Sequence, residues 1–79
     1  MSKETLTTAS EAEHIRRIVR NRTTGRFLDE EGNWTEFADC ALIFPTFLSA
    51  VTWCLESGLP HAEVVLRFEP FESEIAVPI

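Results

Sequence analysis

The sequence predicts a small α+β domain in which one helix packs across one face of a mainly antiparallel sheet of three or four strands. With 79 residues the chain makes a single domain, 1–79, whose core has room for one sheet and one or two helices. Its composition, 44% hydrophobic and 25% charged, is that of an ordinary globular protein. Residues 46–57 are patterned as a helix, whereas the other apolar segments are short or alternate with polar residues. A ferredoxin-like arrangement is the alternative, and it would need residues 5–20 to supply another strand or helix.

The N-terminal part of the chain is compatible with two structures. Residues 1–10 are polar, and we expect them to be frayed. Residues 10–13 follow the pattern of a helix capping box, and the apolar spacing that follows predicts a helix over 12–20. The alternative is a strand over 15–22 that ends in a turn at 23–25, where Asn21 and Gly25 suit positions with positive φ.

The segment that follows is expected to be extended around an acidic turn. Phe27 and Leu28 return from the first turn, and residues 29–33 form the next one. Residues 34–37 and 40–44 are predicted to be extended. In the second of these, the residues that share one face are Cys40, Leu42 and Phe44.

The helix is the most strongly indicated element. Pro45 suits the first helical position, and Gly58 suits the residue that ends the helix. An apolar stripe at helical spacing predicts the face that packs on the sheet, and it consists of Phe47, Leu48, Val51, Cys54 and Leu55. Trp53 falls on the opposite side, so we expect it to be exposed and to act as a partner-binding anchor. The alternative is that residues 1–14 or the C-terminal tail fold over it.

The C-terminal part predicts one strand, followed by either a second strand or a docked tail. Over residues 63–69, alternation places Val64, Leu66 and Phe68 toward the core. The residues expected to face outward are Glu63, Val65, Arg67 and Glu69. After Pro70, residues 75–79 alternate again and predict either a short final strand or a docked tail.

The residues that could bind a metal or act as nucleophiles do not form a known site. Cys40 and Cys54 lie among apolar neighbours, so we expect both to be buried thiols, with a disulfide between them as an alternative. Neither forms a close pair with the other or with a histidine, as zinc requires, and the 29–40 stretch lacks the glycine position and final glutamate of a calcium loop. The three glycines fall at turns or a helix end, not in a phosphate-binding loop. We therefore expect no metal, no cofactor and no enzymatic activity. A small thiol enzyme using a cysteine with His14 or His61 is the alternative.

Charge is distributed unevenly along the chain. Residues 1–26 hold six bases and three acids, whereas residues 27–79 hold ten acids and the single base Arg67. The acidic part could be a surface that binds a basic partner, a solubilising surface, or a set of charges neutralised by the arginines after folding. The acidic residues predicted to contact a partner are Asp29, Glu30, Glu31, Glu36, Asp39, Glu63, Glu69, Glu72 and Glu74. Alternate carboxylates on a strand, such as Glu72 and Glu74, would have a spacing comparable with that of successive nucleic-acid phosphates.

Two resemblances follow from these residues. The pattern R20-N-x-x-T-G-x-F-L28, followed by G32-x-W-T-E36 and A41-x-x-F44, resembles that of small bacterial and phage proteins without an assigned activity. That resemblance covers residues 18–68 and implies a hairpin, a further strand, one helix and a closing strand, which favours the strand over 15–22. In size, acidity and lack of enzymatic motifs, the chain also resembles phage anti-CRISPR proteins. This second resemblance implies a DNA mimic that inhibits type I systems.

We accordingly expect a non-enzymatic inhibitor whose acidic surface blocks target-DNA binding by a CRISPR surveillance complex. The partner would be a protein with a basic DNA-binding surface, such as the large subunit of a type I surveillance complex. With a net charge of −6, direct nucleic-acid binding is not expected. No membrane-spanning or signal segment is evident, so we expect a cytoplasmic protein, and a monomer rather than a dimer. The alternative outside enzymology is a structural accessory protein.

Overall fold

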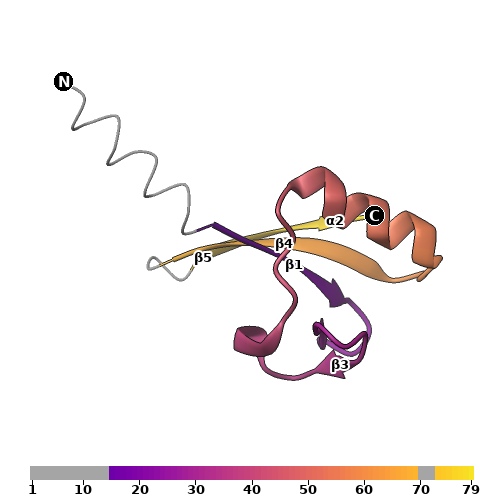
Figure 1. Cartoon of the computed structure of the whole chain (residues 1–79), viewed down its shortest axis with the longest axis horizontal. Helices are drawn as coiled ribbons and strands as arrows, with labels where there is room; N and C mark the ends of the chain where they lie inside the picture. The colour runs from indigo at the N-terminus through magenta and orange to yellow at the C-terminus, as the bar shows by residue number, and fades with distance from the viewer. Residues whose placement is uncertain (1–14, 70–72) are drawn as a thin grey trace.

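Within the described residues, five antiparallel strands form one sheet, and one α-helix packs on one of its faces (Figure 1). The computed structural model describes residues 15–69 and 73–79. The elements in chain order are β1 Ile15–Asn21, β2 Phe27–Leu28, β3 Trp34–Thr35, the 3-10 helix η1 Ala38–Cys40, α2 Phe47–Ser57, β4 Ala62–Phe68 and β5 Ser73–Pro78. The α+β class is confirmed, with one strand more than the largest number predicted. The predicted frayed end, the capping box at 10–13 and Glu72 lie outside the described residues.

The central strand is β1, in the sheet order β3-β2-β1-β4-β5. It pairs with β4 along its whole length, from Ile15 opposite Phe68 to Asn21 opposite Ala62. The helix alternative is therefore wrong from Ile15 onward. The apolar spacing was ambiguous because both faces of the sheet are covered, so neighbouring apolar residues of β1 can both be buried.

The turn after β1 is built by local hydrogen bonds. The Asn21 side-chain oxygen accepts from the Thr23 N–H at 2.8 Å, and the Gly25 N–H donates to the Asn21 carbonyl at 2.7 Å. Gly25 has φ 77°, a left-handed conformation that glycine adopts without steric cost. The chain can therefore reverse and place Phe27 opposite Arg20.

Helix α2 begins and ends where the sequence predicts. The Thr46 hydroxyl accepts from the Ser49 N–H at 3.0 Å, and the Ser49 hydroxyl accepts from the Thr46 N–H at 3.2 Å. Gly58, with φ 70°, ends the helix. Because Thr46 is the N-cap, Pro45 precedes the cap and does not occupy the first helical position.

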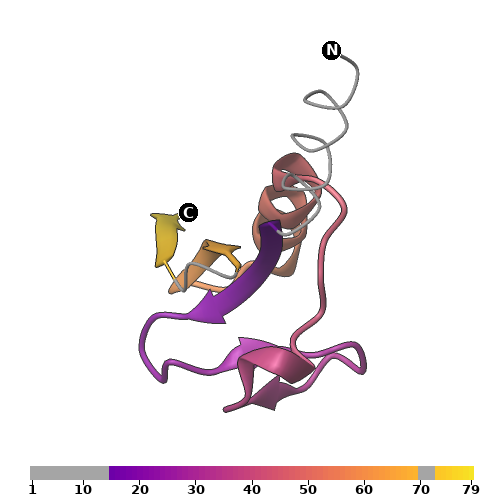
Figure 2. The same cartoon turned by 90° about the vertical axis from the view of Figure 1, so that its left-hand side faces the viewer.

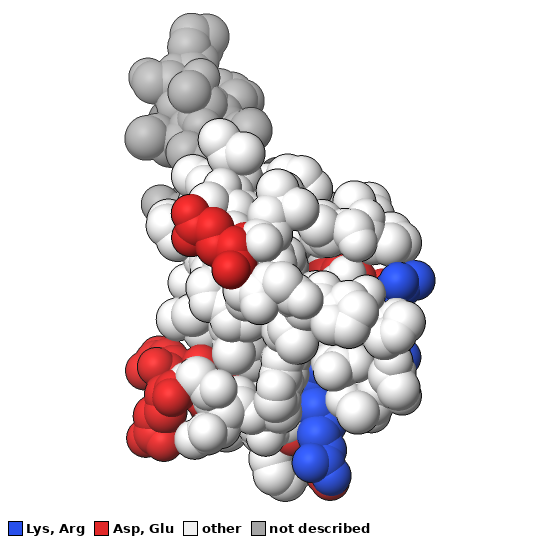
Figure 3. All heavy atoms as spheres, turned by 90° about the vertical axis from the view of Figure 1, so that its right-hand side faces the viewer, with Lys and Arg blue, Asp and Glu red and all other residues white. Residues whose placement is uncertain are grey.

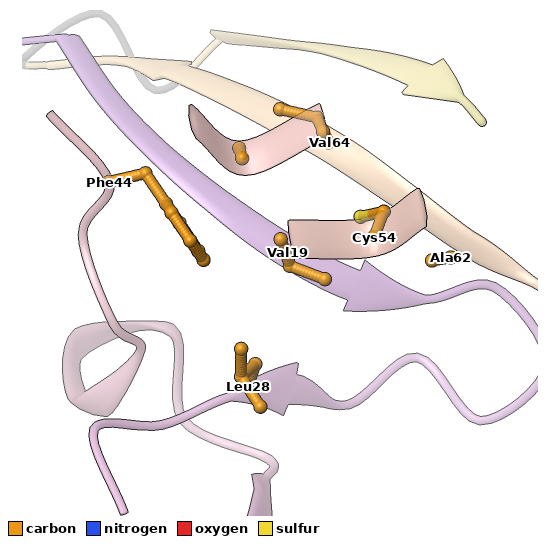
Figure 4. Packing of buried hydrophobic residues seen from close by; sticks show 7 residues of the cluster. Val19, Leu28, Phe44, Cys54, Ala62 and Val64 are labelled. Atoms are coloured by element: carbon orange, nitrogen blue, oxygen red, sulfur yellow. The ribbon is translucent and has the colours of Figure 1, made fainter. Parts of the chain in front are cut away.

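The helix packs on β1 and β4 through small side chains (Figure 4). Ala50 and Cys54 are buried, whereas Leu48 and Leu55 keep 70% and 67% of their surface exposed. The predicted stripe is therefore wrong at these two leucines and at Phe47, which is also exposed, and it is only partly buried at Val51. Small residues let the helix backbone approach the sheet, whose own branched side chains fill the space. The buried residues of this helix-side core are Val19, Leu28, Phe44, Ala50, Cys54, Ala62 and Val64.

A second buried cluster lies on the other face of the sheet. It joins Ile18 and Val65 from neighbouring strands to Phe27 and Ala41, with Ala38 packed against them. Val65 is fully buried, so the prediction that it faces outward to solvent is wrong. The reason is tertiary: the chain around η1 folds back over this face.

The segment 40–44 is a connector and not the predicted strand. It meets the sheet through the Asp29–Ala41 bridge and through the Leu42 N–H, which donates to the Leu28 carbonyl at 2.8 Å. The Phe44 N–H then donates to the Arg17 carbonyl at 2.8 Å. The segment therefore lies on the β2 side of β1, opposite the side occupied by β4.

The described element order does not have the βαββαβ pattern of a ferredoxin-like fold, so that alternative is wrong for residues 15–69 and 73–79. Figure 2 shows α2 above β1, β5 at the far edge, and the β2–β3 hairpin curving away beneath. Over the same residues, no helix combines the length and apolar character needed to cross a bilayer.

Candidate functional site

The sheet face opposite α2 carries an arginine–glutamate network centred on Arg20. Its Nε donates to Glu63 Oε2 at 2.6 Å, and its Nη1 donates to Glu74 Oε2 at 3.0 Å. The guanidinium also lies 5.9 Å from the centre of the Phe27 ring. Burial alone would lower the pKa of Arg20, but the hydrogen bonds to the two glutamates outweigh it and raise the pKa above its ordinary value.

Arg16 forms a second set of contacts on the same face. Its Nη1 lies 3.0 Å from Glu69 Oε2 and 3.3 Å from Asp39 Oδ1, and its Nη2 donates to the Ala38 carbonyl at 3.2 Å. The pKa of Arg16 is raised, chiefly by the hydrogen bond that its guanidinium donates to Glu69. Arg16 therefore ties β1 to the end of β4 and to η1.

These contacts change the role of several acidic residues that the sequence assigned to a partner. Glu63 is only 7% exposed and paired with Arg20, so it is not available as a surface contact. Glu69 and Glu74 are partly exposed but already paired with arginines. Sequence-distant arginines thus neutralise much of the acidic segment, as one of the three interpretations of the charge pattern expected.

Five of the other acidic residues that the sequence assigned to a partner lie in what we call the acidic lobe, residues 29–40. This segment contains five acids and no base. Asp29 Oδ1 accepts from the backbone N–H groups of Glu31 and Asn33 at 3.0 and 2.8 Å, which fixes the turn and leaves Glu30 and Glu31 exposed. Figure 3 shows acidic atoms gathered at the lower corner of the molecule, where the β2–β3 hairpin lies.

The lobe contains a small open hollow of about 240 Å³, lined by Asp29, Glu30, Glu31 and Cys40. Two further acids lie outside the hollow and have only exposed ion pairs. Glu36 lies 3.5 Å from Arg26, and the Asp39 side chain is 95% exposed beside Arg16. Exposed ion pairs of this kind contribute little free energy, because water screens the two charges, so both carboxylates stay accessible. Among residues 15–69 and 73–79, no three His, Cys, Asp or Glu side chains are grouped to hold a metal ion.

Trp53 was predicted to be exposed, but its side chain packs against Phe44. It is partly buried, and its ring centre lies 6.5 Å from that of Phe44. A shallow hollow of about 450 Å³ lies beside the two rings and is bordered by Thr46, Leu48, Ser49, Thr52 and Glu56. The helix is rotated so that Trp53 packs at the margin of the core. Its contacts therefore stabilise the fold, in contrast to the predicted role as a partner-binding anchor. Trp34, on β3, is likewise partly buried against this core.

Sequence reasoning missed the exposed apolar residues. Leu48 and Leu55 lie on the outer side of α2, and Ile75 on β5 keeps 53% of its surface exposed. The alternation of residues 75–79 was visible in the sequence, but it could not show that β5 would lie at an edge of the sheet.

The two cysteines differ, contrary to the prediction that both are buried. Cys40 is exposed and Cys54 is buried, and burial raises the pKa of the Cys54 thiol. A buried thiol of raised pKa is a poor nucleophile, which argues against a thiol enzyme based on Cys54.

Brief treatment of the native protein with iodoacetamide is therefore expected to alkylate Cys40 and leave Cys54 unmodified, as measured by peptide mass spectrometry. In denaturant both residues should react, which serves as the control. Equal alkylation rates in the native protein would contradict the burial of Cys54.

Comparison with known proteins found no matching family model, no matching curated protein and no matching solved structure.

Proposed function

We propose that the protein is a non-enzymatic inhibitor that binds a basic, nucleic-acid-binding surface of a protein partner through its acidic lobe. The observation that carries this proposal is the concentration of five acids without a base in residues 29–40. Three of the acids outside the lobe, Glu63, Glu69 and Glu74, are held by arginines of β1. Glu36 and Asp39 of the lobe contact Arg26 and Arg16 only in exposed pairs, so within the described residues the unpaired negative charge is concentrated at the turn 29–31.

The exposed carboxylates of Glu30 and Glu31 would take the place of phosphates in the partner's groove. Their charges would also speed the encounter with a basic surface, because opposite charges steer diffusing proteins together. This mechanism fits the anti-CRISPR class that the sequence resembles, with the large subunit of a type I surveillance complex as the partner and the bacterial cytoplasm as the place of action. The proposed contact surface contains fewer residues than the sequence suggested, since Glu63 of β4 and Glu74 of β5 form ion pairs with Arg20 within the sheet.

The test measures binding to a purified type I surveillance complex and competition with its target DNA duplex. We expect the protein to compete with the duplex and to bind more weakly as salt rises, because salt screens charges within about 10 Å at 0.1 M. Glu30→Lys and Glu31→Lys, each made singly, should lower the association rate several-fold. Glu56→Lys is the matched control, since it reverses another exposed charge, on α2 away from the lobe, and it should bind nearly as the parent does.

Simultaneous binding of the DNA and this protein to the complex, with neither weakening the other, would contradict the mimicry. Equal losses from Glu30→Lys and Glu56→Lys would show that overall charge matters and that the lobe has no special role.

A further inference from the structure

Strand β5 lies at one end of the sheet and offers an open edge. It pairs with β4 on one side, and no described strand occupies its other side. The open edge is six residues long, from Ser73 to Pro78. An open edge of this kind is a template for pairing with another strand.

The backbone groups that point outward follow from one hydrogen bond. The Ile79 N–H donates to the Ala62 carbonyl of the β4 side at 3.2 Å. In an antiparallel pair, the N–H and C=O of a residue point the same way and alternate along the strand. Residues 75 and 77 therefore bond to β4, whereas Glu74, Ala76 and Pro78 point outward, and Pro78 has no N–H to offer.

The side chains of β5 suit a self-association. Ile75 lies opposite Leu66 on the helix-side face but remains 53% exposed, since α2 packs over β1 and β4. The carboxylate of Glu74 is held by Arg20 at 3.0 Å on the other face, so its charge is offset within the chain. The edge carries no lysine, the residue that commonly guards an open strand.

We propose that two copies of the chain pair their β5 strands antiparallel about a two-fold axis at Ile75. Glu74 then lies opposite Ala76 of the partner subunit, and the two symmetric pairs each exchange two backbone hydrogen bonds. The two Ile75 side chains meet across the axis and remove apolar surface from water. The five-stranded sheets join into one, and this dimer replaces the monomer expected from sequence.

The register is selected by the chemistry of the outward residues. An axis at Glu74 would set two like charges opposite each other, which destabilises a strand pair. An axis at Ala76 would set Glu74 opposite Pro78, which cannot donate a hydrogen bond. Of these three axes, only the one at Ile75 places Glu74 opposite Ala76, so that the N–H and the C=O of both residues find partners and no like charges face each other.

The test is the mass of the full chain in solution, measured by sedimentation equilibrium. We expect twice the 9.0 kDa of one chain. Ile75→Lys and Ala76→Pro should each give the single-chain mass, the first by placing a charge at the axis and the second by removing an outward N–H. Ala76→Pro leaves the β4 bonds intact, because that N–H does not face β4. Ile43→Lys is the matched control: Ile43 is 51% exposed on the β2 side of β1, and this variant should remain dimeric.

Hydrogen exchange gives a second measurement that does not depend on variants folding. The amides of Glu74 and Ala76 should exchange slowly in the parent, although β4 offers them no acceptor. A parent that stays at the single-chain mass up to millimolar concentration would overturn the proposal. So would a dimer that survives both β5 substitutions, or fast exchange at these two amides in the dimer.

Discussion

Replacing Phe44 by alanine is expected to lower the free energy of unfolding by about 3–5 kcal/mol. Phe44 is 7% exposed, belongs to the helix-side core and packs beside Trp53. Its removal would leave a cavity between α2 and the connector, because the Phe44 backbone is held to β1 by the bond to Arg17 and cannot collapse freely. For a chain of 79 residues, whose total stability is about 4–12 kcal/mol, such a loss is a large share.

Urea unfolding followed by circular dichroism would measure this loss, and Leu55→Ala is the control. Leu55 was predicted to face the sheet, but it is 67% exposed, so its truncation should change the free energy of unfolding by no more than about 0.5 kcal/mol. If Leu55→Ala costs as much as Phe44→Ala, the orientation of α2 described above is wrong.

Replacing Arg20 by methionine is expected to lower the free energy of unfolding by about 2–3 kcal/mol, somewhat less than the loss of about 3–5 kcal/mol from breaking a fully buried ion pair. Methionine keeps much of the apolar stem, but Glu63, whose side chain is only 9% exposed, loses its charged partner in the sheet. The expected loss is smaller than for a fully buried pair because 21% of the Arg20 side chain is exposed to water, which screens the interaction.

Arg26→Met is the matched control for the network. Its contact with Glu36 is 3.5 Å long and exposed on both sides, so the loss should be about 0.5 kcal/mol or less. Thermal or urea unfolding of the two variants under the same conditions would compare them. Equal losses would show that Glu63 does not depend on Arg20 for its place in the sheet.

The candidate site was only partly predictable from the sequence. The acidic turn at Glu30 and Glu31 is local, and its exposure follows from the polar residues around it. The burial of Glu63 was not predictable, because its partner Arg20 lies 43 residues earlier in the chain and meets it only when β1 pairs with β4. The same holds for Trp53, whose environment is set by Phe44 and not by its helical neighbours.

The sequence by itself determined helix α2, the turns and strand β4, because the signals for them act within a few residues, whereas it left β1 open between helix and strand and wrongly predicted a strand at 40–44. Thr46 begins α2 through its hydrogen bonds with Ser49, and Gly58 ends it through its left-handed conformation. Both signals are local to the helix ends. Only the tertiary structure decided which side of α2 faces the sheet, that Val65 is buried under the chain around η1, and that β5 lies at an edge. The physical reason is that the burial of a residue depends on which residues pack against it. Hydrophobic attraction is non-directional, so the partners of a residue are fixed only when the strands pair and the chain folds over them.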